Sequence, residues 1–428
     1  MTNGKKEGNA HLIKNTVGGV IGNVLEWYDF AIFGYFAPVI GTQFFPSEDK
    51  LAGLIKVFGV FAAGYLMRPL GGMLFGFIGD RIGRKKALEI SVLLMALPTT
   101  LVGLLPTYAQ VGVLAAVLLI ILRLAQGVSV GGELIGSIAF ITEVSPPKRR
   151  GFFGSWTLFS AVGGIMLGSL VAAVMHGVMS AEALKTWGWR VPFLLGIGIG
   201  GFSLWMRTGL SETKEFKKSK EEGKTAKNPV LDVVREMPGS ILHLAAIVIL
   251  MGGGFYMLFV WMPTYLSQIV KPHVSHALGV NTAAMLAMML AIPFFGGLSD
   301  RFGRKKIIAL CSLGFIILGY PLFMMLDQGV LHLVIIAQLI CAMLMAGIQG
   351  AVPATMVEMF PTRLRYSGVA IGYNITLAVF GGTSPLICTW LIKATGDIAA
   401  PAYYLIAMSA ASMIAALVIK DRHREPLT

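Results

Sequence analysis

The chain has 428 residues, of which 55% are hydrophobic and only 13% are charged. This composition is too apolar for one or two water-soluble domains, so it predicts an integral membrane protein that lies in a lipid bilayer. The net charge of +13 does not indicate nucleic-acid binding, because the basic residues are spread over alternate loops instead of being gathered on one solvated face.

Apolar segments of membrane-spanning length recur along most of the chain. A helix needs roughly 20 apolar residues to cross a bilayer. The segments that meet this requirement are 17–40, 52–79, 87–106, 111–142, 152–175, 191–206, 239–268, 277–298, 307–326, 331–357, 368–392 and 400–419. They predict an all-α membrane protein with twelve transmembrane helices. Lysines and arginines concentrate in one set of alternate loops, so both termini are expected in the cytoplasm.

The first predicted helix contains two carboxylic acids near the middle of the bilayer. Glu26 and Asp29 are three residues apart, so their side chains lie about 60° apart on one face of the helix. A charge at this depth is costly and needs a partner or a function. The aromatic residues Trp27 and Tyr28 lie beside the two acids in the sequence.

Two arginines follow, one on the second predicted helix and one on the fourth. By helical rise, Arg68 and Arg123 both approach mid-membrane, at about the depth of the two acids. Gly127 and Gly131 follow Arg123 on the fourth helix, and their four-residue spacing allows neighbouring helices to approach closely. Asp29 and Glu26 are therefore plausible partners for Arg123.

The two halves of the chain are related by a repeat. The residues Gly76, Asp80, Arg81, Gly83, Arg84, Lys85 and Lys86 recur 220 positions later as Gly296, Asp300, Arg301, Gly303, Arg304, Lys305 and Lys306. A weaker match relates Glu143 to Glu358 at the end of the fourth helix of each half. The repeat predicts an N-terminal six-helix bundle at 1–206, a cytoplasmic linker at 207–238 and a C-terminal six-helix bundle at 239–428.

The buried charges do not follow this repeat. Aligned through Glu143 and Glu358, Arg123 corresponds to Gln338. Aligned through Pro38 and Pro263, Glu26 and Asp29 correspond to Met251 and Gly254. The scaffold is duplicated, but the ionisable groups belong to one half. We therefore expect the chemistry of the protein to lie in the N-terminal bundle.

The repeated loop, of the form Gly-x-x-x-Asp-Arg-x-Gly-Arg-Lys-Lys, resembles the loop between the second and third helices of the major facilitator superfamily. Three further motifs resemble the metabolite:proton symporters of that superfamily, and they are Glu26-Trp27-Tyr28-Asp29-Phe30, Arg68-Pro69-Leu70-Gly71-Gly72 and Arg123-x-x-Gln126-Gly127-x-x-x-Gly131-Gly132-Glu133. The proline/betaine carriers are the most similar, through Gly154-Ser155-Trp156. The resemblance implies the major facilitator fold of two pseudo-symmetric six-helix bundles, in a bacterial inner membrane.

The resemblance also implies a function. It predicts a proton-coupled symporter that imports a small carboxylate-bearing metabolite by rocking of the two bundles around a central site. A zwitterionic compatible solute such as proline or betaine is the first expected substrate, and a di- or tricarboxylate such as 2-oxoglutarate or citrate is the alternative. A transporter-like membrane sensor is an alternative of another class.

Other classes of activity are not expected. The chain shows no recognisable pairing of nucleophile and base, so we do not expect an enzyme. Cys311, Cys341 and Cys388 have no disulfide or metal-ligand spacing, and no metal or cofactor other than the transported proton is expected. The expected partners are the solute and the lipid bilayer, and the expected state is a monomer.

Each buried charge then has a predicted role. Asp29 is expected to take the coupling proton, with Glu26 as the second candidate, because a carboxylate beside a movable cation can alternate between charged and neutral forms. Arg123 is expected to bind the substrate carboxylate by two parallel hydrogen bonds. The alternative is a static salt bridge between Asp29 and Arg123 that fixes helix packing. Arg68 is either a second anion contact or the partner of Glu26, and both roles stay open.

Aromatic side chains near the acids suit a quaternary ammonium group, which is attracted to their faces. Packing against neighbouring helices or lipid is the alternative. The residues expected to line the substrate site together with the two arginines are Trp27, Tyr28, Gln126, Trp156, Tyr256 and Tyr373.

The duplicated loops are expected to form a cytoplasmic gate. Asp80 and Asp300 can accept hydrogen bonds at a helix N-terminus across the interface between the halves. Arg84 and Arg304 can pair with Glu143 and Glu358, and the resemblance implies that these contacts close the inside when the carrier opens outward. The predicted gating residues are Asp80, Arg81, Arg84, Glu133, Glu143, Asp300, Arg301, Arg304 and Glu358.

Overall fold

The structure is a computed structural model. It describes residues 23–24, 26–81, 84–131, 133–208, 229–274 and 276–427. Within these ranges, the side chains of 75–81, 84–89, 91–92, 133, 140, 143–144, 199, 203, 206–208 and 362–363 are not described. All regular elements in the described ranges are helices, as the composition predicts.

The elements of the N-terminal half follow one another with short connections. They are helical residues 26–35, α2 (Ala37–Phe44), α3 (Lys50–Leu66), α4 (Arg68–Arg81), α5 (Arg84–Leu104), α6 (Tyr108–Val111), α7 (Val113–Ser129), α8 (Glu133–Val144), α9 (Arg150–Val178), α10 (Ala181–Thr186) and α11 (Val191–Thr208). Asp49 caps α3, because its carboxylate accepts hydrogen bonds from the backbone N–H groups of Leu51 and Ala52.

The elements of the C-terminal half begin after the part of the linker, 209–228, that lies outside the described residues. They are α13 (Pro229–Glu236), α14 (Pro238–Ile249), α15 (Met262–Thr264), α16 (Ala277–Phe302), α17 (Arg304–Asp327), α18 (Leu331–Glu358), α19 (Thr362–Thr376), α20 (Ser384–Thr395) and α21 (Pro401–Val418). Pro238 and Pro401 are the first residues of α14 and α21. Proline is tolerated there because a backbone N–H at the first position of a helix has no acceptor within the helix.

Nine helical segments in the described part of the chain are long and apolar enough to cross a membrane. They are Lys50–Leu74, Val113–Ala139, Pro147–Val178, Pro238–Ile269, Ala277–Phe302, Arg304–Asp327, Leu331–Glu358, Leu364–Thr395 and Pro401–Val418. A shorter apolar helix, Leu93–Leu104, overlaps the predicted segment 87–106. The all-helical membrane fold is confirmed, and the full count of twelve spans stays a prediction.

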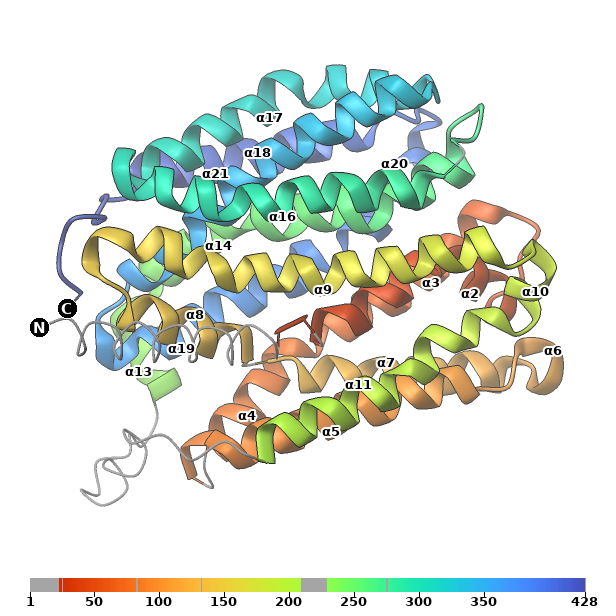
Figure 1. The fold of residues 1–428 in the computed structure, drawn as a ribbon, viewed down its shortest axis with the longest axis horizontal. Helices are drawn as coiled ribbons and strands as arrows, with labels where there is room; N and C mark the ends of the chain where they lie inside the picture. The colour runs from red at the N-terminus through yellow and green to blue at the C-terminus, as the bar shows by residue number, and fades with distance from the viewer. Residues whose placement is uncertain are drawn as a thin grey trace, which may run out of the picture.

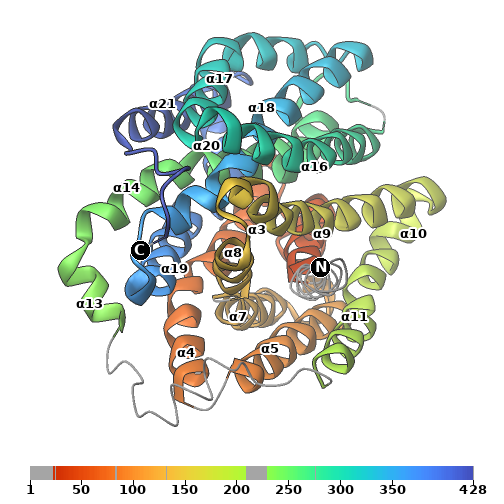
Figure 2. The same cartoon turned by 60° about the vertical axis from the view of Figure 1, so that its left-hand side comes forward.

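The helices run along the long axis of the molecule in two groups (Figure 1). One group contains α14, α16, α17, α18 and α21, and the other contains α3, α5, α7 and α11 (Figure 2). Helix α9 of the N-terminal half packs along α16 of the first group, and further contacts join α3 to α20 and α4 to α19. The exact bounds of the two predicted bundles stay a prediction.

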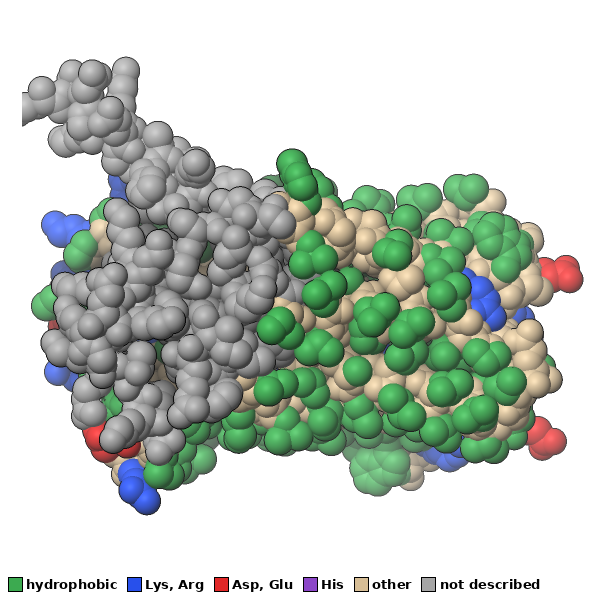
Figure 3. Space-filling view, turned by 90° about the horizontal axis from the view of Figure 1, so that it is seen from below, with side chains coloured by type: hydrophobic (Ala, Val, Ile, Leu, Met, Phe, Trp, Pro, Cys, Tyr) green, Lys and Arg blue, Asp and Glu red, His purple; other side chains and the backbone are tan. Residues whose placement is uncertain are grey.

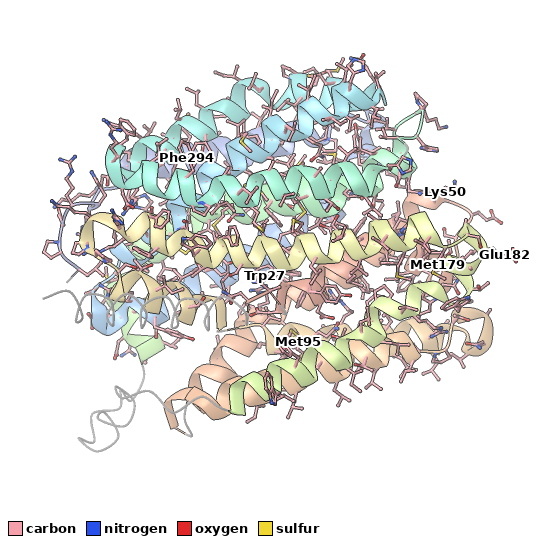
Figure 4. The ribbon with its side chains drawn as sticks, viewed as in Figure 1. Trp27, Lys50, Met95, Met179, Glu182 and Phe294 are labelled. Carbon is pink, nitrogen blue, oxygen red and sulfur yellow. The ribbon has the colours of Figure 1, made fainter. Side chains whose placement is uncertain are left out.

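The outer surface is suited to lipid. On the face shown in Figure 3, hydrophobic side chains cover most of the described surface, and charged side chains lie toward its two ends. Lys50 and Glu182 lie at one end of the molecule, whereas Trp27 and Met95 lie nearer to the middle of its length (Figure 4). A hydrophobic belt between two charged ends is the arrangement that a bilayer requires.

The predicted helix at 111–142 is divided in the structure into α7 and α8. Gly131 follows α7 and lies directly against the backbone of Gly72 on α4, where a Cβ atom would overlap that backbone. The carbonyl oxygen of Gly131 accepts a hydrogen bond from Asn374 of α19, at 2.8 Å. Because the helix is divided here, the carbonyl oxygen of Gly131 is available to a donor from the other half of the molecule.

Two other predicted helices contain π-helical turns. These turns are Leu250–Gly254, Tyr256–Trp261 and Tyr265–Ile269 in the first of them and Leu377–Gly381 in the second. Such turns occur frequently at functional sites, because they shift the direction of the side chains that follow. One of them begins at Tyr256, a residue that the sequence analysis assigned to the substrate site.

Candidate functional site

Arg123 projects from α7 into a fully buried environment. Its guanidinium carbon lies 4.2 Å from the ring centroid of Phe33 and 4.8 Å from that of Phe30. Its Nη1 atom donates a hydrogen bond to Oε1 of Gln126 at 2.9 Å. Within the described part of the chain, its Nε and Nη2 atoms have no hydrogen-bond partner. Buried unpaired donors on a cation are costly, so they favour binding of an anionic acceptor.

Arg68 is the first residue of α4, directly after a turn at Met67. Its guanidinium carbon lies 5.3 Å from the ring centroid of Trp27 and 5.2 Å from that of Tyr65. Its Nε atom donates to Oδ1 of Asn374 at 3.5 Å, while Nη1 has no hydrogen-bond partner among the residues that the structure describes. This second buried arginine thus also retains an unused donor.

Glu26 belongs to the surroundings of Arg68. It is buried, and both its charge and the charge of Arg68 act on Tyr65 and Tyr373. The structure therefore brings together four residues that the sequence analysis placed at mid-membrane or in the substrate site: Glu26, Trp27, Arg68 and Tyr373.

Asp29 is connected to Arg123 through Gln126. The Nε2 atom of Gln126 donates to Oδ2 of Asp29 at 3.0 Å, while its Oε1 atom accepts the hydrogen bond from Arg123. Thr99 on α5 donates to Oδ1 of Asp29 at 2.5 Å. The expected partnership of Asp29 and Arg123 is thus mediated by a residue that was predicted to contact substrate.

Aromatic residues from both halves meet beside the two arginines. The hydroxyl groups of Tyr65 on α3 and Tyr256 form a hydrogen bond, and their ring centroids lie 5.1 Å apart in a T-shaped arrangement. Phe30 packs against Tyr65 in the same way, with 4.9 Å between centroids. We call these rings together with Glu26, Trp27, Asp29, Arg68, Thr99, Arg123, Gln126, Tyr373 and Asn374 the central cluster.

Two predicted site residues lie outside the central cluster. The Tyr28 hydroxyl donates to the carbonyl oxygen of Pro192 on α11, at 3.3 Å. Trp156 is half-buried, and its ring packs on Phe152 and Phe159 of the same helix. Tyr28 was predicted as an aromatic neighbour of the two acids and Trp156 as an aromatic residue of a motif, and neither signal determines the direction in which a side chain leaves its helix.

Three polar members of the central cluster, Tyr65, Thr99 and Asn374, do not follow from the sequence analysis. Each is a polar residue inside an otherwise apolar predicted helix, and this is the signal that could have identified them. Thr99 follows Pro98, and Tyr65 lies three residues before Arg68, hence on the same face.

A second polar cluster lies at the N-terminus of α9. The two carboxylate oxygens of Asp300 accept hydrogen bonds from the backbone N–H groups of Gly151 and Phe152, at 2.8 and 2.9 Å. Arg304 forms ion pairs with Asp300 at 2.8 Å and with Glu358 at 3.1 Å. We call these residues the gate cluster. It joins α9 of the N-terminal half to α16, α17 and α18 of the C-terminal half, in the pattern that the repeat predicts.

The gate cluster is closely packed. A Cβ atom on Gly151 would overlap the backbone of Gly296 on α16, so glycine is required for this approach. Arg150 donates to the carbonyl oxygen of Glu425 at 2.8 Å, which brings the segment after α21 onto the same end of the molecule. Arg301 instead lies 5.3 Å from the ring of its neighbour Phe302. The side chains of Asp80, Arg81, Arg84, Glu133 and Glu143 are not among those described.

The opposite end of the molecule has its own contact between the halves. Asp49, before α3, pairs with Lys393 on α20. The hydrogen bond from the Lys393 ammonium group, together with the bonds from the α3 backbone, holds the pKa of the Asp49 carboxyl below its usual range. The pair is exposed, so its contribution to stability is small.

Comparison with known proteins identifies the family. A model described as "Sugar (and other) transporter" matches residues 16–251, and one described as "Major Facilitator Superfamily" matches residues 269–428. The chain is 34% identical over 428 residues to a glycine betaine/proline/ectoine/pipecolic acid transporter of Dickeya dadantii, covering 97% of this chain and 85% of that protein. The chain belongs to the major facilitator superfamily.

Other relatives of this chain are also transporters of proline, betaine or ectoine. It is 37% identical over 432 residues to an ectoine/proline transporter of Corynebacterium glutamicum, covering 96% of this chain and 84% of that one. A proline/betaine transporter of Salmonella typhimurium is 33% identical over 416 residues, covering 95% and 83%. This protein is therefore a multi-pass membrane transporter and not an enzyme.

Solved structures show the same fold. The transporter matches a proton:xylose symporter bound to 6-bromo-6-deoxy-D-glucose with a TM-score of 0.72, at 18% identity and 98% coverage of both chains. It matches a partially occluded inward-open conformation of the xylose transporter of E. coli with a TM-score of 0.70, at 18% identity and 98% and 100% coverage. The predicted major facilitator fold is confirmed.

Proposed function

We propose that this transporter is a proton-coupled symporter that imports a small carboxylate-bearing compatible solute, with proline or betaine as the first candidates. The names of its relatives support this substrate class. The observation that carries the proposal is the state of Arg123, a fully buried guanidinium whose Nε and Nη2 donors are unused in the described part of the chain.

These two donors suit a carboxylate. The Nε and Nη2 N–H groups lie on one edge of the planar guanidinium, and that edge binds a carboxylate through two parallel hydrogen bonds. Tyr65 and Tyr256 belong to the same central cluster, and aromatic rings of this kind attract a substituted ammonium group. A zwitterion with one carboxylate and one ammonium therefore complements the central cluster.

Proton coupling follows from the link between Asp29 and Arg123. While Asp29 is ionised, its charge compensates Arg123 through Gln126. When Asp29 takes a proton, that compensation is lost, and the guanidinium gains affinity for the carboxylate of the substrate. Proton and substrate thus bind together and are released together, which is the requirement for symport.

Alternating access then uses the two ends of the molecule. The gate cluster holds α9 against α16 and α18, and we place it on the cytoplasmic side of a bacterial inner membrane with both termini in the cytoplasm, following the distribution of lysines and arginines. Separation of Asp300 from the N-terminus of α9 opens the path inward.

A second substrate class is supported by Arg68. Its Nη1 donor, which is unused among the described residues, offers a contact for another carboxylate, so a dicarboxylate such as 2-oxoglutarate is the alternative. Uptake of labelled proline, betaine, 2-oxoglutarate and citrate into proteoliposomes with an inward proton gradient separates the two. We expect accumulation of proline or betaine that a protonophore abolishes. Accumulation of only the multivalent acids would overturn the zwitterion assignment, and accumulation of none would favour a sensor.

A further inference from the structure

The Thr99 hydroxyl has two acceptors for one hydrogen. Its Oγ1 atom lies 2.5 Å from Oδ1 of Asp29 and 2.7 Å from the carbonyl oxygen of Met95, one turn earlier on α5. A hydroxyl carries one hydrogen and two acceptor lone pairs, so Thr99 donates to only one of these oxygens at a time. The second oxygen is then without the Thr99 hydrogen, and a hydrogen bond to it needs another donor.

We propose that Thr99 is a positioning residue which allows Asp29 to gain and lose its proton without leaving a buried polar group unpaired. When Asp29 is ionised, the Thr99 hydroxyl donates to it. When Asp29 is protonated, its O–H donates to Oγ1 of Thr99, and the Thr99 hydrogen turns to the carbonyl of Met95. The proton comes from the solution on one side of the membrane and leaves to the other. This inference rests on the proposed role of Asp29.

Gln126 completes the network in both states. One of its amide N–H groups points to Oδ2 of Asp29 at 3.0 Å and the other to Oγ1 of Thr99 at 2.8 Å. In the protonated state, Oδ2 becomes the carbonyl oxygen of the acid and still accepts from Gln126. Oγ1 of Thr99 then accepts from both Asp29 and Gln126, which uses its two lone pairs. The heavy atoms need not move, and only hydrogens change place.

The alternative to this arrangement is unfavourable. Thr99 and Asp29 are both 3% exposed and Gln126 is fully buried. A buried carboxylic acid without an acceptor for its O–H, or a buried carboxylate short of a donor, loses the full benefit of that hydrogen bond. A side chain that cannot exchange donor for acceptor would therefore stabilise one protonation state at the expense of the other.

The remaining groups around Asp29 do not exchange roles in this way. From α7, Arg123 acts on it as a fixed charge. From its own helix, Tyr28 is adjacent, but the hydroxyl of Tyr28 donates to Pro192 of α11, and Glu26 acts on Tyr65 and Tyr373. On α5, Thr99 is the residue that can exchange donor and acceptor roles with Asp29.

Substitutions at two neighbouring threonines test the proposal. Thr99→Val keeps the shape of the side chain and removes the hydroxyl, while Thr99→Ser keeps the hydroxyl. Thr100→Val is the matched control, because the Thr100 hydroxyl donates to the carbonyl oxygen of Ala96 at 2.8 Å, also one turn earlier on α5. The measurements are the pH profile of proton-driven solute uptake in proteoliposomes, and the exchange of labelled for unlabelled solute without a proton gradient.

We expect Thr99→Val to lower proton-driven uptake roughly tenfold, the loss that follows from one hydrogen bond to a charged group. The pH of half-maximal uptake should shift by about one unit, because a tenfold change in proton binding is one pH unit. Solute exchange should change by less than about twofold, since the solute-binding donors of Arg123 are untouched. Thr99→Ser and Thr100→Val should both retain the wild-type pH profile.

Two results would overturn the proposal. One is a wild-type pH profile in Thr99→Val, and the other is an equal shift in Thr100→Val, which would indicate a general effect on α5. If Thr99→Val does not fold, Thr99→Ala removes the same hydroxyl and is judged by the same measurements. Asp29→Asn is measured in parallel. If Asp29→Asn still accumulates solute, the proposed role of Asp29 in proton coupling is wrong. If Asp29→Asn does not accumulate solute but Thr99→Val has the wild-type pH profile, only the proposed role of Thr99 is wrong.

Discussion

The gate cluster and the central cluster both contain buried arginines, but they use them differently. Arg304 in the gate cluster contacts Asp300, Glu358 and Ser299, so its charge is balanced by two carboxylates. Arg123 in the central cluster is linked to one carboxylate, that of Asp29, only indirectly through Gln126. Two of its N–H groups have no hydrogen-bond partner in the described part of the chain.

We propose that the difference separates charges that hold the two halves together from charges that bind solute and proton. A charge whose hydrogen bonds are all made within the protein holds helices together and gains nothing from a ligand. A buried donor that has no partner instead lowers the free energy of the protein when it binds an acceptor from outside. Substitutions in the gate cluster should therefore alter stability and conformation, whereas substitutions in the central cluster should alter affinity and coupling.

The largest effect on stability is expected for Arg304→Met. This change leaves the carboxylates of Asp300 and Glu358 buried without their cation, at a cost of about 3–5 kcal/mol. Thermal unfolding of the purified protein should show a clear decrease in the midpoint. Arg301→Met is the control, because Arg301 is exposed and contacts only the ring of Phe302 among the interactions described. Equal midpoints for the two variants would contradict the distinction.

The next effect is on affinity and is expected for Arg123→Lys. A lysine keeps the charge but cannot offer two parallel N–H groups, so the Kd for the solute should rise roughly tenfold to hundredfold, as measured by equilibrium binding. Arg190→Lys is the matched control, because the Arg190 guanidinium donates to backbone carbonyls of Gly103 and Leu105. An unchanged Kd in Arg123→Lys would place the carboxylate elsewhere.

The smallest effect is expected for the exposed pair at the opposite end, through Asp49→Asn. Because the pKa of Asp49 is lowered in the folded protein, its contribution to stability is present above the ordinary pKa of about 4 and is lost as the pH falls through the folded value. At pH 7 the thermal midpoint should fall by less than about 2 °C. The difference from the wild type should shrink below about pH 4. If Lys393→Ala lowered the thermal midpoint further in the Asp49→Asn background, the loss of the Asp49–Lys393 pair would not explain the effect of Asp49→Asn.

In the described part of the chain, the contacts of the gate cluster follow the sequence repeat more closely than those of the central cluster do. The repeat assigns Asp300, Arg304 and Glu358 to the ends of adjacent helices, and short loops leave few ways to arrange them. The predicted contacts of Asp300 with the N-terminus of α9 are therefore present in the structure.

The central cluster depends on how each helix is rotated about its axis. Depth along a helix follows from counting residues, so Glu26, Asp29 and Arg123 could be placed at one level. Rotation is determined by packing, which the sequence does not show directly. For this reason the insertion of Gln126 between Asp29 and Arg123 was not foreseen, nor was the direction of Tyr28 toward α11.

Helix interruptions were the other feature that the sequence could not place. The segment 111–142 is mostly apolar apart from Arg123, Gln126 and Glu133. In the structure α7 ends at Ser129, next to the close contact between Gly131 and Gly72. Asn374 uses the backbone carbonyl of Gly131, and it also contacts Arg68. The interruption therefore connects the C-terminal half to the central cluster.

The most direct test of the account is proton-driven accumulation by Asp29→Asn in proteoliposomes. Asparagine has nearly the same shape but cannot take up a proton. We predict that Asp29→Asn exchanges labelled for unlabelled solute across the membrane yet fails to concentrate solute under a pH gradient. Accumulation at the level of the wild type would contradict it, because another residue would then carry the proton.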